Sequence, residues 1–113
     1  MVVRVEFRTP SYFALAALID GPLHGYAIVQ RAADLSDGTV HLSTGTLYAL
    51  LDRAIAERLV EAGDPYLERG RQRRDYRLTP SGRTELEAET ARMVRAATVV
   101  GTRLRLTPRA ATS

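Results

Sequence analysis

The 113-residue sequence contains no cysteine, so disulfide bonds and thiolate metal sites are excluded. No run of apolar residues approaches the ~18 that cross a membrane as a helix. The first ten residues, MVVRVEFRTP, also lack the apolar stretch of a secretory signal peptide. From these absences we expect a cytoplasmic protein that has no contact with a membrane.

Lysine is absent too, so all 16 basic side chains are arginine, and the formal net charge is +3 at pH 7. Five of these arginines fall between residues 69 and 77, where the single acid is Asp75. The exclusive use of arginine fits a bias in genomic base composition. It also fits phosphate binding, because the planar guanidinium binds phosphate through two hydrogen bonds. The two explanations are compatible, and base composition is the simpler of them. The excess of positive charge is nevertheless concentrated on this one short stretch.

Apolar residues at helical spacing predict three short helices in the first half of the chain. The first begins with Thr9 as N-cap and Pro10 at its first position. After a turn at DGPLHG, residues 20–25, the second runs over about residues 26–35. The third begins after Ser43, whose hydroxyl is predicted to accept a free backbone N–H of the first turn.

The pattern changes at Leu59. The stretch LVEAGDPYLERGRQRRDYRLT predicts two strands joined by a loop rich in glycine, proline and charge, and its last residue, Thr79, caps a long helix over about residues 81–105. The apolar residues of this helix approximate a heptad seam formed by Leu86, Met93, Ala97, Val100 and Leu104. The seam could pack on its own domain, but pairing with a second copy accounts better for a helix of about 25 residues.

Three short helices followed by a hairpin are the arrangement of a winged helix-turn-helix. We therefore expect a mostly α fold with a small β-hairpin wing and a C-terminal dimerisation helix. Residues 1–80 would form the DNA-binding domain, and residues 81–113 the dimerisation helix with a loose tail. In this fold one helix enters the major groove of double-stranded DNA while the wing touches backbone or minor groove. Arginines on the hairpin would then meet phosphates.

Three segments carry a family resemblance. GPLHGYAIVQ (residues 21–30), STGTLYALLDR (43–53) and GRQRRDYRLTPSGR (70–83) resemble, in order and spacing, the signature segments of PadR-family transcriptional regulators. The similarity covers roughly residues 10–90 and is closest to the short subgroup with one C-terminal helix. It implies a homodimer that represses transcription from a palindromic operator.

The resemblance also implies which residues face DNA. STGTLY would begin the recognition helix, Tyr26 would lie near a phosphate, and GRQRR would form the tip of the wing. The predicted DNA-binding residues are Tyr26, Ser43, Thr44, Thr46, Tyr48, Arg71, Arg73 and Arg74. Judged by the residues alone, Ser43 is also an N-cap, and the others could be ordinary solvated surface.

The sequence departs from the family pattern at three positions. Thr44 and Ala49 stand where the family often has proline, and Thr44 keeps a hydroxyl that can reach DNA. Arg58 replaces a glycine that ends the third helix. Glycine adopts a left-handed conformation there without steric cost, whereas arginine does so at a cost, so we expect this helix to end differently.

Family members sense ligands at the dimer interface, often aromatic or hydrophobic molecules. By resemblance, a small effector of this kind would be held by Tyr12, Phe13, Met93 and Ala97. The same four residues could instead be core.

Neither a metal nor a cofactor is expected, because His24 and His41 show no ligand spacing, and His24 suits the cap of the second helix. No Ser-His-Asp set, phosphate-binding loop or paired-carboxylate site is evident, so an enzyme is not expected. The alternative function is a winged-helix module that docks on a partner protein and barely touches DNA.

Overall fold

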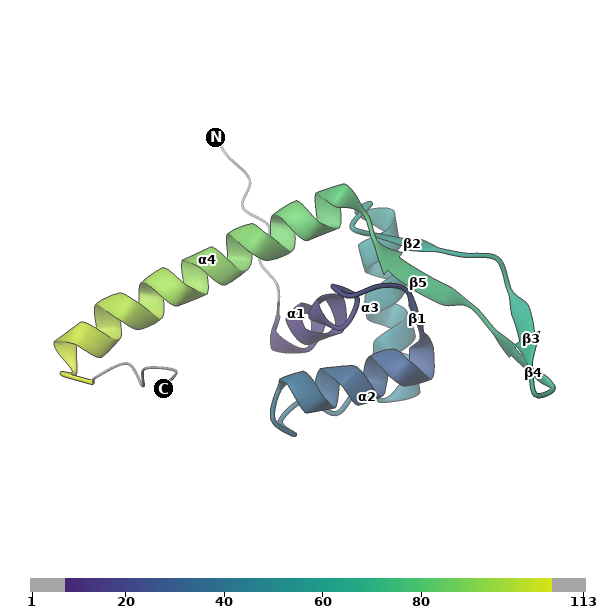
Figure 1. The fold of residues 1–113 in the computed structure, drawn as a ribbon, viewed down its shortest axis with the longest axis horizontal. Helices are drawn as coiled ribbons and strands as arrows, with labels where there is room; N and C mark the ends of the chain where they lie inside the picture. Colours follow the sequence, from purple (N-terminus) through teal and green to yellow (C-terminus); the bar gives the residue numbers. More distant parts are fainter. Residues whose placement is uncertain (1–7, 107–113) are drawn as a thin grey trace.

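A computed structural model describes residues 8–106 of the chain, and the tail predicted after Thr107 lies outside them. Within this range the fold is mostly helical with two small antiparallel sheets (Figure 1). In chain order the elements are α1 (Thr9–Ala16), β1 (Leu23–His24), α2 (Gly25–Leu35), α3 (Thr44–Ala56), β2 (Val60–Ala62), β3 (Tyr66–Glu68), β4 (Arg71–Arg73), β5 (Asp75–Leu78) and α4 (Pro80–Arg103).

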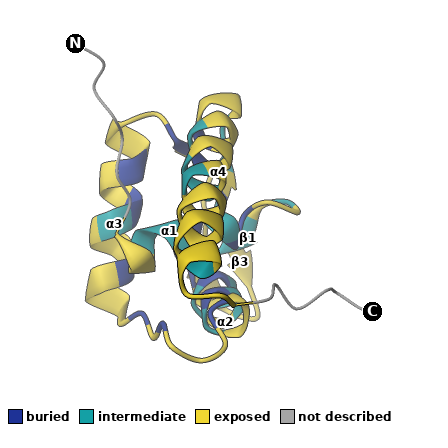
Figure 2. Cartoon of the chain, turned by 90° about the vertical axis from the view of Figure 1, so that its left-hand side faces the viewer, coloured by how far each residue is buried: buried dark blue, intermediate teal, exposed yellow. Residues whose placement is uncertain are grey.

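The three short helices pack around one apolar core, which the sheet closes on one side. Its largest fully buried side chains are Leu18, Ile28, Leu51 and Val60, from the turn after α1, from α2, from α3 and from β2. Figure 2 shows the buried residues on the faces that these elements turn toward one another. Burying each large apolar side chain contributes about 1.5–3 kcal/mol of free energy, and this packing holds α2 and α3 at a fixed angle.

The N-terminal caps of three helices are as predicted: His24 for α2, Ser43 for α3 and Thr79 for α4. His24 through Nδ1 and Ser43 through Oγ each accept a backbone N–H of the following first turn, at 3.3 and 3.2 Å. The cap predicted for α1 is wrong: Thr9 is its first helical residue, and Arg8 takes the cap position with an extended backbone. Pro10 still lies in the first turn, where its missing N–H leaves no hydrogen bond unmade.

The first sheet has the strand order β1-β5-β2, with all pairs antiparallel. Strand β1 lies in the segment that the sequence predicts only as a turn, so that prediction is incomplete. Leu23 pairs with Tyr76 and His24 with Asp75, both in β5. The sequence could not predict this strand, because two residues show no periodicity. The strand forms because β5 offers its backbone hydrogen-bonding partners, which is a tertiary contact.

The second sheet is the far end of the hairpin. Beyond β2 and β5 the chain continues as the β3–β4 ladder, which projects from the body (Figure 1). We call residues 63–74 the wing. None of them belongs to the buried core. Arg69 and Gly70 form the two-residue connection, with φ of 50° and 77°, which is the type I′ geometry that matches the twist of a hairpin.

Helix α3 ends as it would with glycine. Arg58 has φ of 63°, its N–H donates to the Ile55 carbonyl at 3.0 Å, and the Leu59 N–H donates to the Ala54 carbonyl at 2.9 Å. These two bonds define a Schellman motif with Arg58 at its left-handed position. The expectation that this helix ends differently is therefore wrong: the arginine bears the steric cost and the exit toward β2 is retained.

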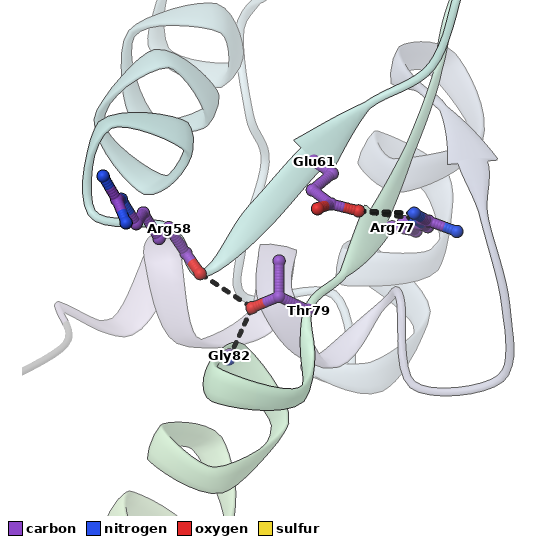
Figure 3. A network of polar contacts seen from close by, with 5 residues as sticks. All are labelled: Arg58, Glu61, Arg77, Thr79 and Gly82. Atoms are coloured by element: carbon purple, nitrogen blue, oxygen red, sulfur yellow. Dashed lines mark hydrogen bonds and ion pairs between the residues drawn. The ribbon is translucent and has the colours of Figure 1, made fainter.

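The junction of α3 with α4 is closed by Thr79 (Figure 3). Its hydroxyl donates to the Arg58 carbonyl at 2.7 Å and accepts the Gly82 N–H at 2.8 Å. A Cβ on Gly82 would overlap the backbone carbonyl of Leu59. The start of α4 is therefore pressed against the chain between α3 and β2, at a distance that only glycine permits.

Helix α4 has two unlike halves. The first packs on the body: Leu86 is buried in the core, and the Thr90 hydroxyl lies 2.6 Å from that of Tyr12. The second half, from Met93, projects away from the body, and its side chains are exposed (Figures 1 and 2). Leu86, predicted to lie in a dimer seam, thus packs inside its own subunit.

Candidate nucleic-acid interface

The wing, the first turn of α2 and the first half of α3 border one open hollow. Six of the eight predicted DNA-binding side chains line it: Tyr26, Thr44, Tyr48, Arg71, Arg73 and Arg74. The wing and the exposed rim of α3 therefore lie on a common surface. A duplex can touch both elements at once only if they are arranged in this way.

The N-terminus of α3 presents small hydroxyl groups. Ser43, Thr44 and Thr46 are all exposed. Ser43 caps the helix, and its hydroxyl also donates to Thr46 Oγ1 at 3.0 Å, so these two hydroxyls already bond each other. Both lie beside the hollow, whereas Thr44 lines it. Within residues 8–106, the Thr44 hydroxyl is the one of this turn that forms no such bond, and the positive end of the helix dipole favours an anion near it.

Two tyrosines flank the first turn of α2. Tyr26 is 62% exposed, and its hydroxyl accepts a hydrogen bond from Gln30 Nε2 at 2.9 Å. Tyr48 of α3 lies against Gly25, where a Cβ would stand 2.9 Å from the Tyr48 hydroxyl oxygen. The absence of a side chain at Gly25 therefore lets this phenol reach the α2 N-terminus. Two hydroxyls and the free N–H groups of that turn are suited to one phosphate.

The wing arginines differ from one another. Arg69 at the turn, Arg71 and Arg74 are exposed, and none of them forms an ion pair with another residue in the range 8–106. Arg73 is different: its side chain is only 24% exposed, and its Nε lies 2.9 Å from Glu68 Oε1. Three free guanidinium groups and one constrained group therefore make up the basic wing.

Two further tyrosines belong to the sheet and the wing. The hydrogen bond that Tyr66 donates to Asp75, at 2.7 Å, raises the pKa of Tyr66. Burial, and after it the neighbouring Tyr48, raises the pKa of Tyr76. Both phenols thus stay neutral in the physiological range, so Tyr76 places no negative charge behind the hollow.

Sequence reasoning missed one member of the site. His24 lines the hollow and contacts Arg73, with Nδ1 3.3 Å from Arg73 Nη1, whereas the sequence assigned it only a capping role. The residues are 49 positions apart, so no local pattern could signal the contact. Arg69, which belongs to the arginine-rich stretch of the sequence, lies at the turn of the wing and does not line the hollow.

The predicted effector residues fall into two pairs. Tyr12 and Phe13 in α1 pack against the core with ring centroids 5.3 Å apart and the rings nearly perpendicular. Met93 and Ala97 are exposed on the projecting half of α4. Among residues 8–106, no three histidine or acidic side chains lie close enough to hold a metal ion. None of the helices described is long and apolar enough to span a membrane.

A helix-turn-helix with a three-stranded sheet and a projecting basic hairpin defines a winged helix-turn-helix protein. Residues 14–88 match the model of the Transcriptional regulator PadR-like family, and the chain belongs to this family. The resemblance inferred from the sequence, and the winged-helix fold with it, are thereby confirmed. The family is one of transcriptional regulators.

Solved structures share the fold. A PadR family transcriptional regulator from Eggerthella lenta DSM 2243 superposes with a TM-score of 0.68 at 26% identity, covering 88% of this chain and 84% of that one. A PadR family transcription regulator from Clostridium difficile R20291 gives 0.69 at 21% identity, over 86% and 99%. Bacillus subtilis PadR, solved in complex with operator DNA, gives 0.62 at 23%, over 72% and 46%.

One curated relative is more similar in sequence. It is named an uncharacterized 37.1 kDa protein in transposon TN4556 of Streptomyces fradiae, and it is 47% identical over 81 residues. The match covers 72% of this chain and 22% of the relative, so the chain spans about a fifth of that protein's length.

Proposed function

We propose that the protein is a DNA-binding transcriptional repressor that acts as a homodimer on a pseudo-palindromic operator in the cytoplasm. The observation that carries the proposal is the shared hollow, which is lined both by the unpaired wing arginines Arg71 and Arg74 and by the exposed first turns of α3. The solved complex of Bacillus subtilis PadR with operator DNA supports it by analogy of fold.

We expect two kinds of DNA contact, one to phosphates and one to bases. Arg69, Arg71 and Arg74 on the wing would meet phosphates and supply affinity without sequence preference. Ser43, Thr44, Thr46 and Tyr48 would bring the first turns of α3 to base edges in the major groove. Tyr26, at the first turn of α2, would hold a phosphate of the flanking backbone and fix the register.

The projecting half of α4 would form the dimer contact. Four apolar residues remain exposed there: Met93, Ala97, Val100 and Leu104. Burying them against a second copy would stabilise the helix, because removing apolar side chains from water lowers the free energy. The first half of α4 carries Glu85, Glu87 and Glu89 against Arg83 and Arg92, and the second half, from Met93, carries Arg95 and Arg103 without an acid. Charge complementarity therefore favours an antiparallel pair of α4 helices, and a two-fold axis between them.

A small hydrophobic or aromatic effector would fit the same contact. Tyr12 and Phe13 lie where α4 leaves the body, because Tyr12 bonds Thr90, one turn before Met93. A partner's α4 laid along this face would bring Met93 and Ala97 to them, so the pocket would need both subunits. A screen of such compounds by melting temperature and operator affinity tests it, and no response to any of them would argue against an effector.

Selection of bound sequences from random duplexes, followed by footprinting, tests the function as a whole. We expect two inverted half-sites whose centres lie about 10 base pairs, or ~34 Å, apart. Binding without sequence preference would contradict the proposed repressor. Binding to an acidic protein with no binding to DNA would instead favour the interaction module.

A further inference from the structure

His24 stands where three parts of the proposed interface meet. It is the last residue of β1 and the N-cap of α2, and its backbone pairs with Asp75 of β5. Its Nδ1 lies 3.3 Å from the Ala27 N–H nitrogen and 3.3 Å from Arg73 Nη1. One ring nitrogen thus faces two donors, one from the helix and one from the wing.

The wing has few other ways to hold its angle. No residue from 63 to 74 joins the buried core, and β3 and β4 pair only with each other. At the base of the wing the Gly63 N–H donates to the Asp75 carbonyl at 2.7 Å. Among residues 8–106, two side-chain contacts connect the β3–β4 ladder itself to the first sheet: Tyr66 to Asp75, and Arg73 to His24. On its other side Arg73 approaches Glu68 as an ion pair, although its buried Nε is not aligned for a hydrogen bond. Arg73 therefore binds other residues of the protein, namely Glu68 and His24, whereas Arg71 and Arg74 do not.

The chemistry of this contact fixes the state of the ring. An imidazole nitrogen accepts hydrogen bonds only while it carries a lone pair, so both donors require a neutral His24 with its proton on Nε2. Protonation turns Nδ1 into a donor and sets a cation against the Arg73 guanidinium. Histidine is the side chain whose charge ordinarily changes between about pH 5 and 8. The titratable or charged groups around the ring are Tyr26, Tyr48, Glu68, Arg71, Arg73, Arg74 and Asp75.

We infer that neutral His24 is a positioning residue of the interface, which sets the angle of the wing through Arg73, and that protonation of His24 releases the wing. In this role Arg73 connects β4 to the N-terminus of α2 through His24 and makes no phosphate contact of its own. Only the predicted effect on DNA affinity rests on the proposed DNA-binding function. The effect of His24 on the order of the wing can be measured without DNA.

The experiment measures amide hydrogen-exchange protection of wing residues by NMR at pH 7.5 and pH 5.5, corrected for intrinsic exchange. In the wild type we expect protection to fall several-fold on acidification. In His24→Asn, whose carboxamide oxygen can replace Nδ1 as acceptor but takes up no proton, protection should stay constant. The matched control is His41→Asn, because His41 is the other histidine and is exposed before α3; it should behave as the wild type.

Arg73→Gln separates the wing contact from the cap. It leaves His24 free to cap α2, so the body should fold, yet wing protection should be low at both pH values and should no longer respond to acid. Constant protection in the wild type, or an acid response that persists in His24→Asn, would overturn the inference.

Operator affinity at pH 7.5 gives the functional readout. We expect His24→Leu, which removes both the bond from Arg73 and the cap of α2, to bind at least about tenfold more weakly. His24→Asn should restore binding to within about twofold, and Arg73→Gln, which keeps the cap, should weaken binding as His24→Leu does. Equal weakening in His24→Leu and His24→Asn would contradict the positioning role. Failure of every variant and the wild type to bind DNA would refute the proposed function, and the wing measurement would still decide the role of His24.

Discussion

The Thr79 hydroxyl donates a hydrogen bond to the Arg58 carbonyl at 2.7 Å, and so joins the end of α3 to the start of α4. The same oxygen accepts the Gly82 N–H and thereby caps α4. One side chain thus sets the direction in which α4 leaves the winged body. That direction decides where a second subunit, and with it a second recognition helix, would lie.

Thr79→Ala should lower the free energy of unfolding by about 1–2 kcal/mol, because it removes the cap and leaves the Arg58 carbonyl without this donor. Urea denaturation followed by circular dichroism measures the change. Thr79→Ser keeps the hydroxyl and should recover most of the stability. Equal losses in both variants would show that the methyl group, and not the hydroxyl, matters.

Gly82→Ala should destabilise the fold by about 1–3 kcal/mol, because the added methyl overlaps the Leu59 carbonyl and α4 must move. The matched control is Gly45→Ala in α3, where a Cβ meets no atom within 4 Å. This change should raise stability by about 0.5–1 kcal/mol, since alanine loses less backbone entropy in a helix. The same unfolding experiment compares the two, and equal effects would contradict the close approach at Gly82.

Arg58→Gly should stabilise the protein by up to about 1 kcal/mol. Arginine at φ of 63° bears the steric cost of a left-handed backbone, which glycine avoids. Part of the gain is offset because glycine is more flexible in the unfolded chain. Arg58→Ala is the control: it removes the side chain but keeps the Cβ, so stability should hardly change. If Arg58→Ala stabilised the protein as much as Arg58→Gly, the effect would come from the loss of charge and not from backbone conformation.

Arg58 also shows how far the sequence could predict the fold. Helices, hairpin and their order follow from apolar spacing and from caps, which are local signals, and the structure has them nearly as expected. The conformation at Arg58 is dictated by the Schellman hydrogen bonds and by Thr79, 21 residues away, so local preference is overruled. Strand β1 was missed for the same reason, since only pairing with β5 makes it a strand.

The candidate site was predictable in part. Residue types and family spacing identified the tyrosines, the hydroxyls and the arginines, and the structure brings most of them to one hollow. What sequence could not separate was a free arginine from an engaged one: Arg71 and Arg73 are two positions apart and look alike. Residues two apart in a strand lie on the same face, so the pattern of β4 does not separate them. They differ because Arg73, at the end of β4 nearer the body, meets Glu68 and His24, whereas Arg71 adjoins the turn.

Val100→Glu should convert the proposed dimer to a monomer. Val100 is 54% exposed on the projecting half of α4, so a charge there costs the single subunit little but would be buried between two copies. Sedimentation velocity measures the mass, and circular dichroism checks that the helix content is kept. Arg105→Gln, two residues beyond the end of α4, changes the net charge by the same one unit and serves as the control. A wild type that sediments as a monomer would refute the α4 contact.

Replacing Arg71 and Arg74 together by alanine should weaken binding to every DNA sequence and should lower the slope of log K against log salt by about two. Each phosphate contact releases about one counterion, so the slope counts the contacts. Binding isotherms at several salt concentrations, on operator and on random duplex, give both numbers. Arg77→Ala is the control, because the guanidinium of Arg77 is already paired with Glu61 on β2 and lies outside the hollow. Its slope should match the wild type, whereas an unchanged slope in the double variant would show that the wing arginines do not reach phosphate.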